Sequence, residues 1–266
     1  MKRKHLYARL TLGLAAFLIL LPAAVLLLWC VTARWPWPGL LPESWSLRTV
    51  RELLFGSQKL PQLLLSSVAL AGATALLSTL IGLLTARATA LYDFPGRRLV
   101  GFASLLPLLI PGTVFAIGIH LVLLRLHLAD TVTGVLLVHL IAALPYSITI
   151  LSDVTAALGD RLEQQAAVLG APPLRAFFSV TFPELLPGLL SSVSMAFILS
   201  YSQYFTTLIV GGGRVKTLSL VLVPYIQSGD RSLAAVYAAA FVGSALAVFF
   251  LLEGGIHLLR KRGDPQ

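Results

Sequence analysis

Charged residues are scarce in this chain. Asp, Glu, Lys and Arg together make up 12% of the 266 residues, whereas apolar residues make up 57% and the mean hydropathy is +0.88. A soluble globular domain usually carries about 25% charged residues. The composition therefore excludes an ordinary soluble domain and predicts a polytopic membrane protein.

Other absences exclude chemistry. A single cysteine, Cys30, rules out an internal disulfide framework and a cysteine-based metal site. The phosphate-binding pattern Gly-x-x-x-x-Gly-Lys-Ser/Thr is missing, because Gly211-Gly212-Gly213-Arg214 has neither the spacing nor the lysine. The Gly-x-Ser-x-Gly and His-Glu-x-x-His patterns are missing as well. We therefore expect no catalytic residue, cofactor or metal here, and keep a membrane-embedded enzyme only as a minor alternative.

Long apolar runs recur along the chain. A hydrocarbon core about 30 Å thick requires roughly 20 apolar residues of helix. Six runs of this kind occur, at residues 10–32, 61–85, 99–124, 132–152, 187–209 and 232–252. None contains Asp, Glu, Lys or Arg, each of which would cost about 2.5–3.5 kcal/mol at the centre of a span. The predicted fold class is an all-α bundle of six transmembrane helices.

Basic residues and tryptophans predict the orientation. With six spans both termini share one side, and that side carries twelve of the 20 Lys and Arg residues. The positive-inside rule then predicts N-in and C-in topology, with the first run retained as a span. All four tryptophans gather near the outer end of that span, as an interfacial belt does. The net charge of +9 is assigned to membrane flanks and lipid headgroups, so no nucleic-acid partner is expected.

Several local patterns predict departures from straight helices. The amphipathic piece at residues 48–55 is expected either to lie along the membrane surface or to be part of a plain loop. Pro107, Pro111 and Pro145 predict kinks, which favour either a pore-like interior or simply closer packing. Small residues predict close helix contacts at Gly72, Gly82, Gly118, Gly134, Gly188 and Gly243.

A polar segment between the fourth and fifth spans predicts a helical hairpin. Asp160 and Glu163 have the spacing of a capping box, which places a helix start here. The helix should run to Leu169, with Gly170 in the left-handed position that ends it.

The second arm of the hairpin follows from its prolines. Pro173 can open a helix, because its missing N–H is no loss in the first turn, and this helix should run to Val180. Pro183 is expected to stop it, and Pro187 to begin the fifth span. A short polar hairpin beside a membrane suits a groove on another protein, although an ordinary loop has the same composition.

This hairpin resembles the EAA motif of the inner-membrane permeases of binding-protein-dependent ABC importers. Gln164-Gln165-Ala166 stands at the motif's triplet, Gly170 at its glycine and Phe182-Pro183 at its hydrophobic-proline pair. Further positions also fit the common form, namely Leu162, Glu163, Leu169, Ala171, Pro173, Arg175, Phe177 and Thr181. The resemblance implies a type I importer permease fold. It also implies an ATPase-coupling loop at residues 153–186, whose key residues would be Glu163, Gln164, Gln165, Ala166, Gly170, Pro173 and Pro183.

One departure from the motif concerns charge. The triplet's glutamate is Gln164 here, so a salt bridge from that position to an ATPase is absent. Glu163, one position earlier, is a candidate to replace it.

The resemblance extends more loosely over residues 61–252, including Phe94-Pro95-Gly96-Arg97. It divides the chain into a first span with an outer loop (1–60), a permease domain (61–253) and a basic tail (254–266). The implied location is the bacterial inner membrane. The implied partners are cytoplasmic ABC ATPases, a second permease, which we expect to be a different chain, a periplasmic or lipid-tethered binding protein, and membrane lipid. A scaffold subunit without transport is the alternative.

Polar residues in the fifth span are candidates for the translocation path. They are Ser200, Tyr201, Ser202, Gln203, Tyr204 and Thr207. The competing interpretation is hydroxyls satisfied between packed helices. His120 and His139, the ionisable residues of the spans, are expected to be packing residues. The region 197–220 resembles the subgroup that handles polyamines, ferric iron and thiamine-like solutes, so a solute of this kind is expected.

Overall fold

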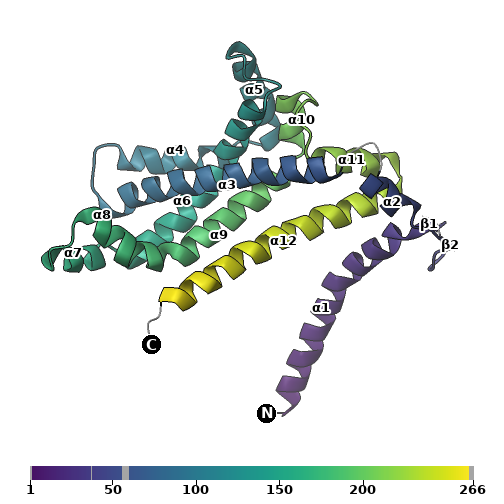
Figure 1. The fold of residues 1–266 in the computed structure, drawn as a ribbon, viewed down its shortest axis with the longest axis horizontal. Coiled ribbons are helices and arrows are strands. Elements are labelled where there is room, and N and C mark those ends of the chain that lie inside the picture. Colours follow the sequence, from purple (N-terminus) through teal and green to yellow (C-terminus); the bar gives the residue numbers. More distant parts are fainter. Residues whose placement is uncertain (1, 37, 56–59, 264–266) are drawn as a thin grey trace. The chain divides into compact units, whose positions relative to one another are not determined.

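The computed structural model describes residues 2–36, 38–55 and 60–263, with side chains from residue 9 to residue 254 within these ranges. The described chain is helical except for two short strands and the connections (Figure 1). It divides into two compact units. One comprises the residues up to Leu64 together with Val221–Ser244, and the other comprises Leu65–Leu220 with the residues from Ala245 onward.

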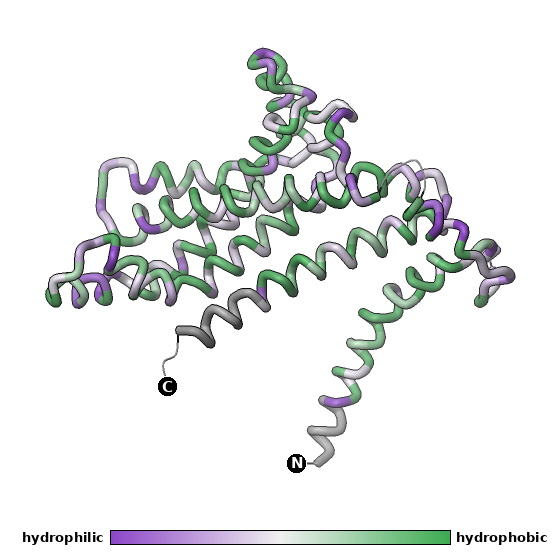
Figure 2. Tube along the Cα trace, in the orientation of Figure 1, coloured by the Kyte–Doolittle hydropathy of each residue, from purple (hydrophilic) through white to green (hydrophobic). Residues whose placement is uncertain are grey.

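The helices confirm the predicted membrane architecture. Five are long and apolar enough to cross a bilayer: α1 (Lys2–Cys30), α3 (Leu60–Leu91), α6 (Val132–Leu158), α12 (Arg231–Gly263) and the continuous Pro173–Tyr201 segment. A sixth candidate is the pair α4 (Arg97–Leu109) and α5 (Gly112–Arg125). Hydrophobic residues dominate these helices, whereas hydrophilic ones gather at helix ends and turns (Figure 2).

The third predicted span, for which prolines predicted kinks, is a pair of helices with a sharp break at Pro111. The axes of α4 and α5 differ by 108°. The break lies at Ile110, whose backbone is extended (φ −95°, ψ 127°), immediately before Pro111. The ring of a proline disfavours helical geometry in the residue before it, so the helix ends there instead of bending gently.

The fifth predicted span begins earlier and ends sooner than expected. Here α8 (Pro173–Ala176), the π-helical turn η1 (Phe177–Thr181) and α9 (Phe182–Tyr201) form one continuous segment. Pro183 does not stop the second arm, because it occupies the first turn of α9, where its missing N–H is no loss. The wider turn before it is closed by the Phe182 N–H, which donates to the Phe177 carbonyl.

The first unit holds both strands and the predicted amphipathic helix. β1 (Thr32–Arg34) pairs antiparallel with β2 (Ser44–Trp45), and α2 (Arg48–Phe55) follows. Trp29 and Trp35 stack with ring centroids 4.8 Å apart. Of the two alternatives for residues 48–55, the structure shows a helix rather than a plain loop.

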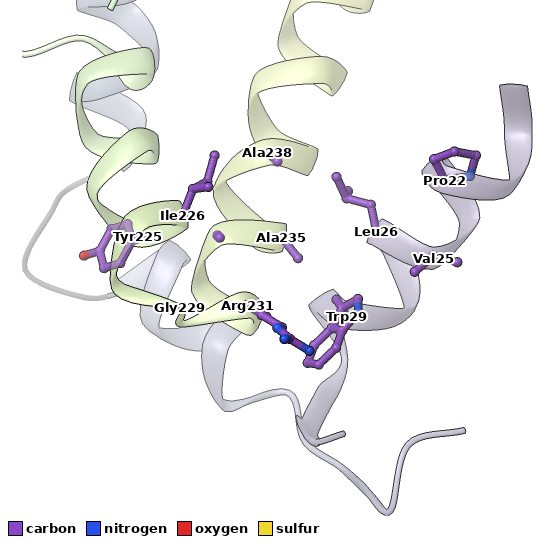
Figure 3. A pocket seen from close by; sticks show the side chains of 11 residues that line it. Pro22, Val25, Leu26, Trp29, Tyr225, Ile226, Gly229, Arg231, Ala235 and Ala238 are labelled. Carbon is purple, nitrogen blue, oxygen red and sulfur yellow. The ribbon is translucent and has the colours of Figure 1, made fainter. Parts of the chain in front are cut away.

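An apolar groove of about 410 Å³ also lies in the first unit (Figure 3). One wall comes from α1, with Pro22 and Leu26, and the other from α11 (Leu218–Ser228) and α12, with Ile226 and Ala235. The Arg231 guanidinium carbon lies 5.5 Å from the Trp29 ring at this groove.

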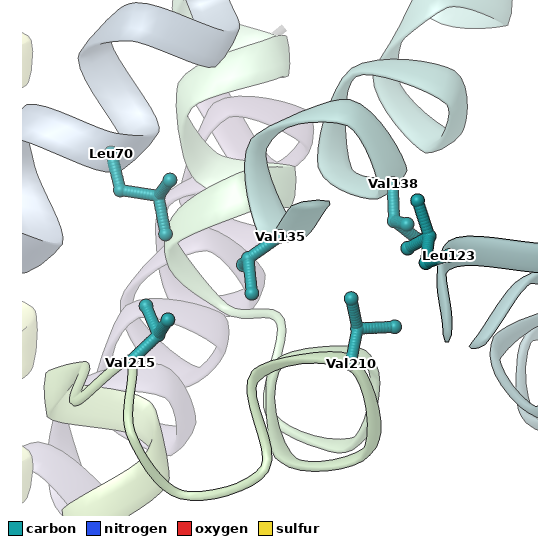
Figure 4. Close-up of a cluster of buried hydrophobic side chains, with 6 residues drawn as sticks. All are labelled: Leu70, Leu123, Val135, Val138, Val210 and Val215. Carbon is teal, nitrogen blue, oxygen red and sulfur yellow. The ribbon is translucent and has the colours of Figure 1, made fainter. Parts of the chain in front are cut away.

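The second unit is built around α6 and α9, which pack along each other. α5 packs against α10 (Phe205–Gly211), and α4 packs on α6. One buried cluster joins α3, α5, α6 and α10 (Figure 4), comprising Leu70, Leu123, Val135, Val138, Val210 and Val215. A second cluster, nearer to residues 160–176, comprises Leu83, Ala86, Leu151 and Leu185.

Two of the six predicted glycine contacts between helices are confirmed. A Cβ on Gly82 would lie 2.9 Å from the Ser147 Cβ, and one on Gly188 would lie 2.9 Å from a Val154 methyl. Gly134 is crowded by the carbonyl of Leu128, which lies in the loop before its own helix, so the predicted contact with another helix is not made there. At the other three positions, Gly72, Gly118 and Gly243, no described atom lies within 4 Å, so the prediction was wrong there. These three glycines permit no close helix crossing within the described chain.

Candidate functional site

The hairpin predicted from the sequence is present. Its first arm, α7 (Arg161–Val168), ends in a turn in which Gly170 has φ +83°. The Gly170 N–H donates to the Ala167 carbonyl (2.9 Å), and the Ala171 N–H donates to the Ala166 carbonyl (3.0 Å). This pair of bonds is the Schellman motif, which satisfies the carbonyls at a helix end. The left-handed role predicted for Gly170 is confirmed, and Pro173 begins α8 as predicted.

The predicted capping box is absent from this hairpin. Asp160 precedes α7 but makes no side-chain bond to its backbone. Instead, Asp160 Oδ2 accepts a hydrogen bond from Gln164 Nε2 (2.7 Å). Glu163 does not reach back to the cap, because its carboxylate is bound by a residue of α3.

That residue is Arg87. Its two terminal nitrogens donate to the two oxygens of Glu163, both at 2.9 Å. The side chains are only 18% and 22% exposed. Burial alone would raise the pKa of Glu163, but hydrogen bonds from Arg87 and Thr181, with the charge of Arg87, lower that pKa below its ordinary value. The Arg87 guanidinium carbon also lies 4.7 Å from the Phe177 ring centroid. Glu163 is therefore engaged within its own chain.

The tip of the hairpin is apolar and exposed. Val168, Leu169 and Leu174 are 88%, 87% and 75% exposed. Gln164 and Gln165 are also exposed on α7, whereas Ala166 is half-buried. Large apolar side chains beside polar ones, at the end of a helical segment, are typical of a surface that another protein covers.

A second feature is the break that separates α9 from α10. Ser202, Gln203 and Tyr204 lie outside the helices. The Gln203 carbonyl accepts hydrogen bonds from Thr207 Oγ1 (2.7 Å) and Ser219 Oγ (3.1 Å). Backbone groups freed by such a break must be satisfied by neighbours inside a membrane, and here hydroxyls satisfy them.

The path candidates divide by exposure around this break. Ser202 is exposed, and Gln203 and Tyr204 are half-buried. The other three, Ser200, Tyr201 and Thr207, are buried within the unit. Among the six candidates, only Ser202, Gln203 and Tyr204 therefore present polar groups at the surface of the described chain.

Two of the buried candidates bond to His139. His139 Nδ1 lies 2.8 Å from Ser200 Oγ, and Nε2 lies 3.0 Å from Thr207 Oγ1. Ser200 Oγ in turn donates to Thr74 Oγ1 (3.3 Å), which extends the network to α3. This satisfied, buried histidine confirms the packing role predicted for His139. Sequence reasoning missed its partners, because they are 61 and 68 residues away and no local pattern joins them.

Comparison with known proteins decides the family. Residues 78–262 match the family described as binding-protein-dependent transport system inner membrane component. The chain belongs to this family. The permease is thus a multi-pass inner-membrane transport protein rather than an enzyme, and membership implies ATPase and binding-protein partners in general terms.

Several named relatives resemble the permease. It is 31% identical over 216 residues to a protein named as an ABC transporter permease, ORF1 of Streptomyces antibioticus, covering 80% of this chain and 94% of that one. It is 30% identical to the molybdate/tungstate transport system permease WtpB of Pyrococcus abyssi, covering 71% and 75%. It is 25% identical to the sulfate transport system permease CysT of Salmonella typhimurium, covering 65% and 68%.

These names correct one expectation about the permease. WtpB and CysT are named for molybdate/tungstate and sulfate, so the predicted polyamine, ferric-iron and thiamine subgroup is not supported. The basis for that subgroup was a resemblance of residues 197–220, which are rich in small and polar residues. Such a composition is compatible with many solutes.

Proposed function

We propose that this permease forms half of the translocation path of an ABC importer for a divalent tetrahedral oxyanion, of the sulfate or molybdate/tungstate class. The observation that carries the substrate class is the similarity to permeases named for these anions. A second permease chain completes the path. A binding protein delivers the anion, and separate ATPase subunits hydrolyse ATP.

In this proposal the hairpin faces the cytoplasm, with both termini on the same side. An ATPase subunit covers Val168, Leu169 and Leu174, which are exposed in the chain alone. Gln164 and Gln165 contribute neutral hydrogen bonds where the family motif has glutamate and alanine. The contact is then mainly apolar, which suits association through burial of surface rather than through ion pairs.

A continuous helix links this contact to the path. The segment Pro173–Tyr201 runs without interruption from the hairpin to the break at Ser202. Twenty-nine residues of helix span roughly 43 Å, enough to cross the hydrocarbon core. A displacement of the hairpin, driven by ATP-dependent closure of the ATPases, therefore reaches the break as a rigid-body movement. Switching between inward-open and outward-open states follows from that movement.

The chemistry of the break suits an anion. Ser202, Gln203 and Tyr204 offer hydroxyl and amide donors, which can bind oxyanion oxygens without a fixed countercharge. No Asp or Glu lies in the six apolar runs to repel a dianion. We propose that these three residues contact the solute, and that Ser200, Tyr201 and Thr207 hold the break in place.

Basic residues lie at the opposite end of the second unit from the hairpin. Arg125, Arg214 and Lys216 are exposed there. The Lys216 carbonyl accepts from Ser66 near the start of α3, whereas Arg87 lies near its end, about 30 Å away by helical rise. Exposed positive charges at this end, which we place at the outer mouth, would raise the local concentration of a dianion.

The test is reconstitution. The permease is purified in proteoliposomes with its second permease and its ATPases, and binding proteins loaded with sulfate, molybdate, tungstate, a polyamine or thiamine are added outside. We expect ATPase stimulation and uptake with an oxyanion-loaded binding protein only. Stimulation by a polyamine- or thiamine-loaded protein alone would reject the oxyanion class and leave the importer intact. Failure to co-purify any ATPase would reject the importer and favour a scaffold.

A further inference from the structure

We propose that Arg87 and Glu163 form an internal latch that fastens the hairpin to α3, so that the two move as one lever when the ATPases close. Arg87 is then a positioning residue for coupling, and Glu163 serves its own chain rather than the ATPase. The inference rests on the proposed function, because the latch has work to transmit only if the hairpin docks on an ATPase.

The latch joins three segments that are distant in sequence. Arg87 belongs to the last turns of α3, Glu163 to α7, and Phe177 to η1. The guanidinium makes two parallel bonds of 2.9 Å to the carboxylate while its carbon lies 4.7 Å from the Phe177 ring centroid. Thr181 provides a second hydrogen-bond donor to Glu163. An arginine held by a bidentate carboxylate and an aromatic face has little rotational freedom left.

Burial makes this pair different from an ordinary surface salt bridge. About four-fifths of each side chain is covered. Exposed pairs contribute little because water screens them and long side chains lose entropy when they are held. The permease also contains such an exposed pair, Arg97 with Asp93, whose side chains are 44% and 95% exposed. It lies near the same end of α3 and serves as a matched control.

The surroundings place the latch where motion would be transmitted. Next to Arg87, Ala86 is fully buried and packs with Leu83, Leu151 and Leu185, which come from α3, α6 and α9. α7 itself packs against α8 and η1, and the ion pair connects it to α3. Movement of α7 is thus passed to α3 through Arg87, and to α9 through the continuous helix. Without the ion pair, this side-chain link from α7 to α3 is lost, whereas the helical connection from α7 to α9 remains.

The Glu163 carboxylate could instead bind a partner protein. The two roles predict different effects of the same mutations on coupling. If Glu163 paired with an ATPase, removing Arg87 would free the carboxylate for that contact and coupling would survive. If the latch is correct, removal of either Arg87 or Glu163 alone breaks it. Removal of both then lowers coupling no further than removal of one.

The experiment measures transported anion per ATP hydrolysed in the reconstituted complex. Variants are Arg87→Met, Glu163→Gln, their double mutant, Arg87→Lys, the swap Arg87→Glu with Glu163→Arg, and the control Arg97→Met. We expect each latch single mutant to lower this ratio at least about fivefold while ATPase co-purification is unchanged. The double mutant should match the singles. Arg87→Lys should be intermediate, because lysine cannot bind the carboxylate in bidentate fashion, and the swap should recover part of the loss.

Three results would each overturn the latch. The first is that the losses of anion transported per ATP in the two single mutants add up in the double mutant. The others are a loss in Glu163→Gln with full coupling in Arg87→Met, and an equal loss in the control Arg97→Met. A second readout does not depend on transport. In the purified permease without ATPase, amide hydrogen exchange of α7 should become faster in both latch mutants and stay unchanged in Arg97→Met. Unchanged exchange in the latch mutants would reject the latch even if transport works. If exchange of α7 becomes faster in the latch mutants but the reconstituted wild-type complex transports no anion, the proposed function is rejected and the latch is kept.

Discussion

Replacing Leu169 by alanine isolates the contribution of the hairpin tip to ATPase docking. Leu169 is 87% exposed in the chain alone, so its side chain contributes little to the stability of the permease. The substitution removes three carbons, each worth about 0.8 kcal/mol when buried. If an ATPase buries the side chain fully, the loss is about 2 kcal/mol. Because about 1.4 kcal/mol changes an equilibrium constant tenfold, the Kd should rise about 30-fold.

The assay titrates purified ATPase onto the permease complex in nanodiscs and measures the Kd. Leu40→Ala is the matched control, since Leu40 is 91% exposed and lies far along the chain, in the connection between β1 and β2. The control should leave the Kd within about twofold, and both variants should keep the thermal midpoint of the wild type. An unchanged Kd for Leu169→Ala, or an equal change in the control, would refute docking at this tip.

Three further predictions address the packing and the charge of the second unit. Gly82→Val should lower the free energy of unfolding, measured in thermal melts, by about 1–3 kcal/mol, because a Cβ there would meet α6 at 2.9 Å. Gly72→Val should have little effect in the same measurement, because no described atom would meet its Cβ within 4 Å. His139→Leu should cost about 1–2 kcal/mol in detergent unfolding, because two buried hydroxyls lose a partner; a stability equal to that of the wild type would show that the network contributes nothing. Because the pKa of Glu163 is lowered in the folded chain, the stability that its carboxylate contributes is fully present above the unfolded pKa of about 4.3. That stability is lost as the pH falls through the folded pKa. Anion transported per ATP should therefore stay constant from pH 8 to about pH 5, and a decline in that window that vanishes in Glu163→Gln would contradict the assignment.

The features that could be predicted from the sequence are those that depend on residues close together along the chain. The six apolar runs were sufficient to predict an all-α membrane bundle, because the cost of charge in lipid acts on each segment separately. The turn at Gly170 was predicted for a similar reason, since a helix end, a glycine and a following proline are determined within a few residues. The EAA-like pattern around that turn indicated the family that comparison then established.

Proline marks the limit of such local reasoning. Pro183 was expected to stop a helix, yet the chain absorbs it in the first turn of α9 after a π-helical turn. Pro111 was expected to kink one span, yet the pair of helices around it is bent by 108°. The residue alone determines only that one N–H is missing, and packing of the neighbouring helices decides how the chain adjusts.

The sequence by itself determined that the chain is a bundle of apolar helices, where the polar hairpin lies and how its first arm ends. Only the tertiary structure decided which side chains meet. Glu163 has the right spacing for a capping box, but its carboxylate is bound by Arg87, 76 residues away. His139 likewise finds Ser200 and Thr207 across the bundle. The physical reason is that a buried polar group must find a partner wherever the fold provides one, and the spacing along the chain carries no record of that meeting.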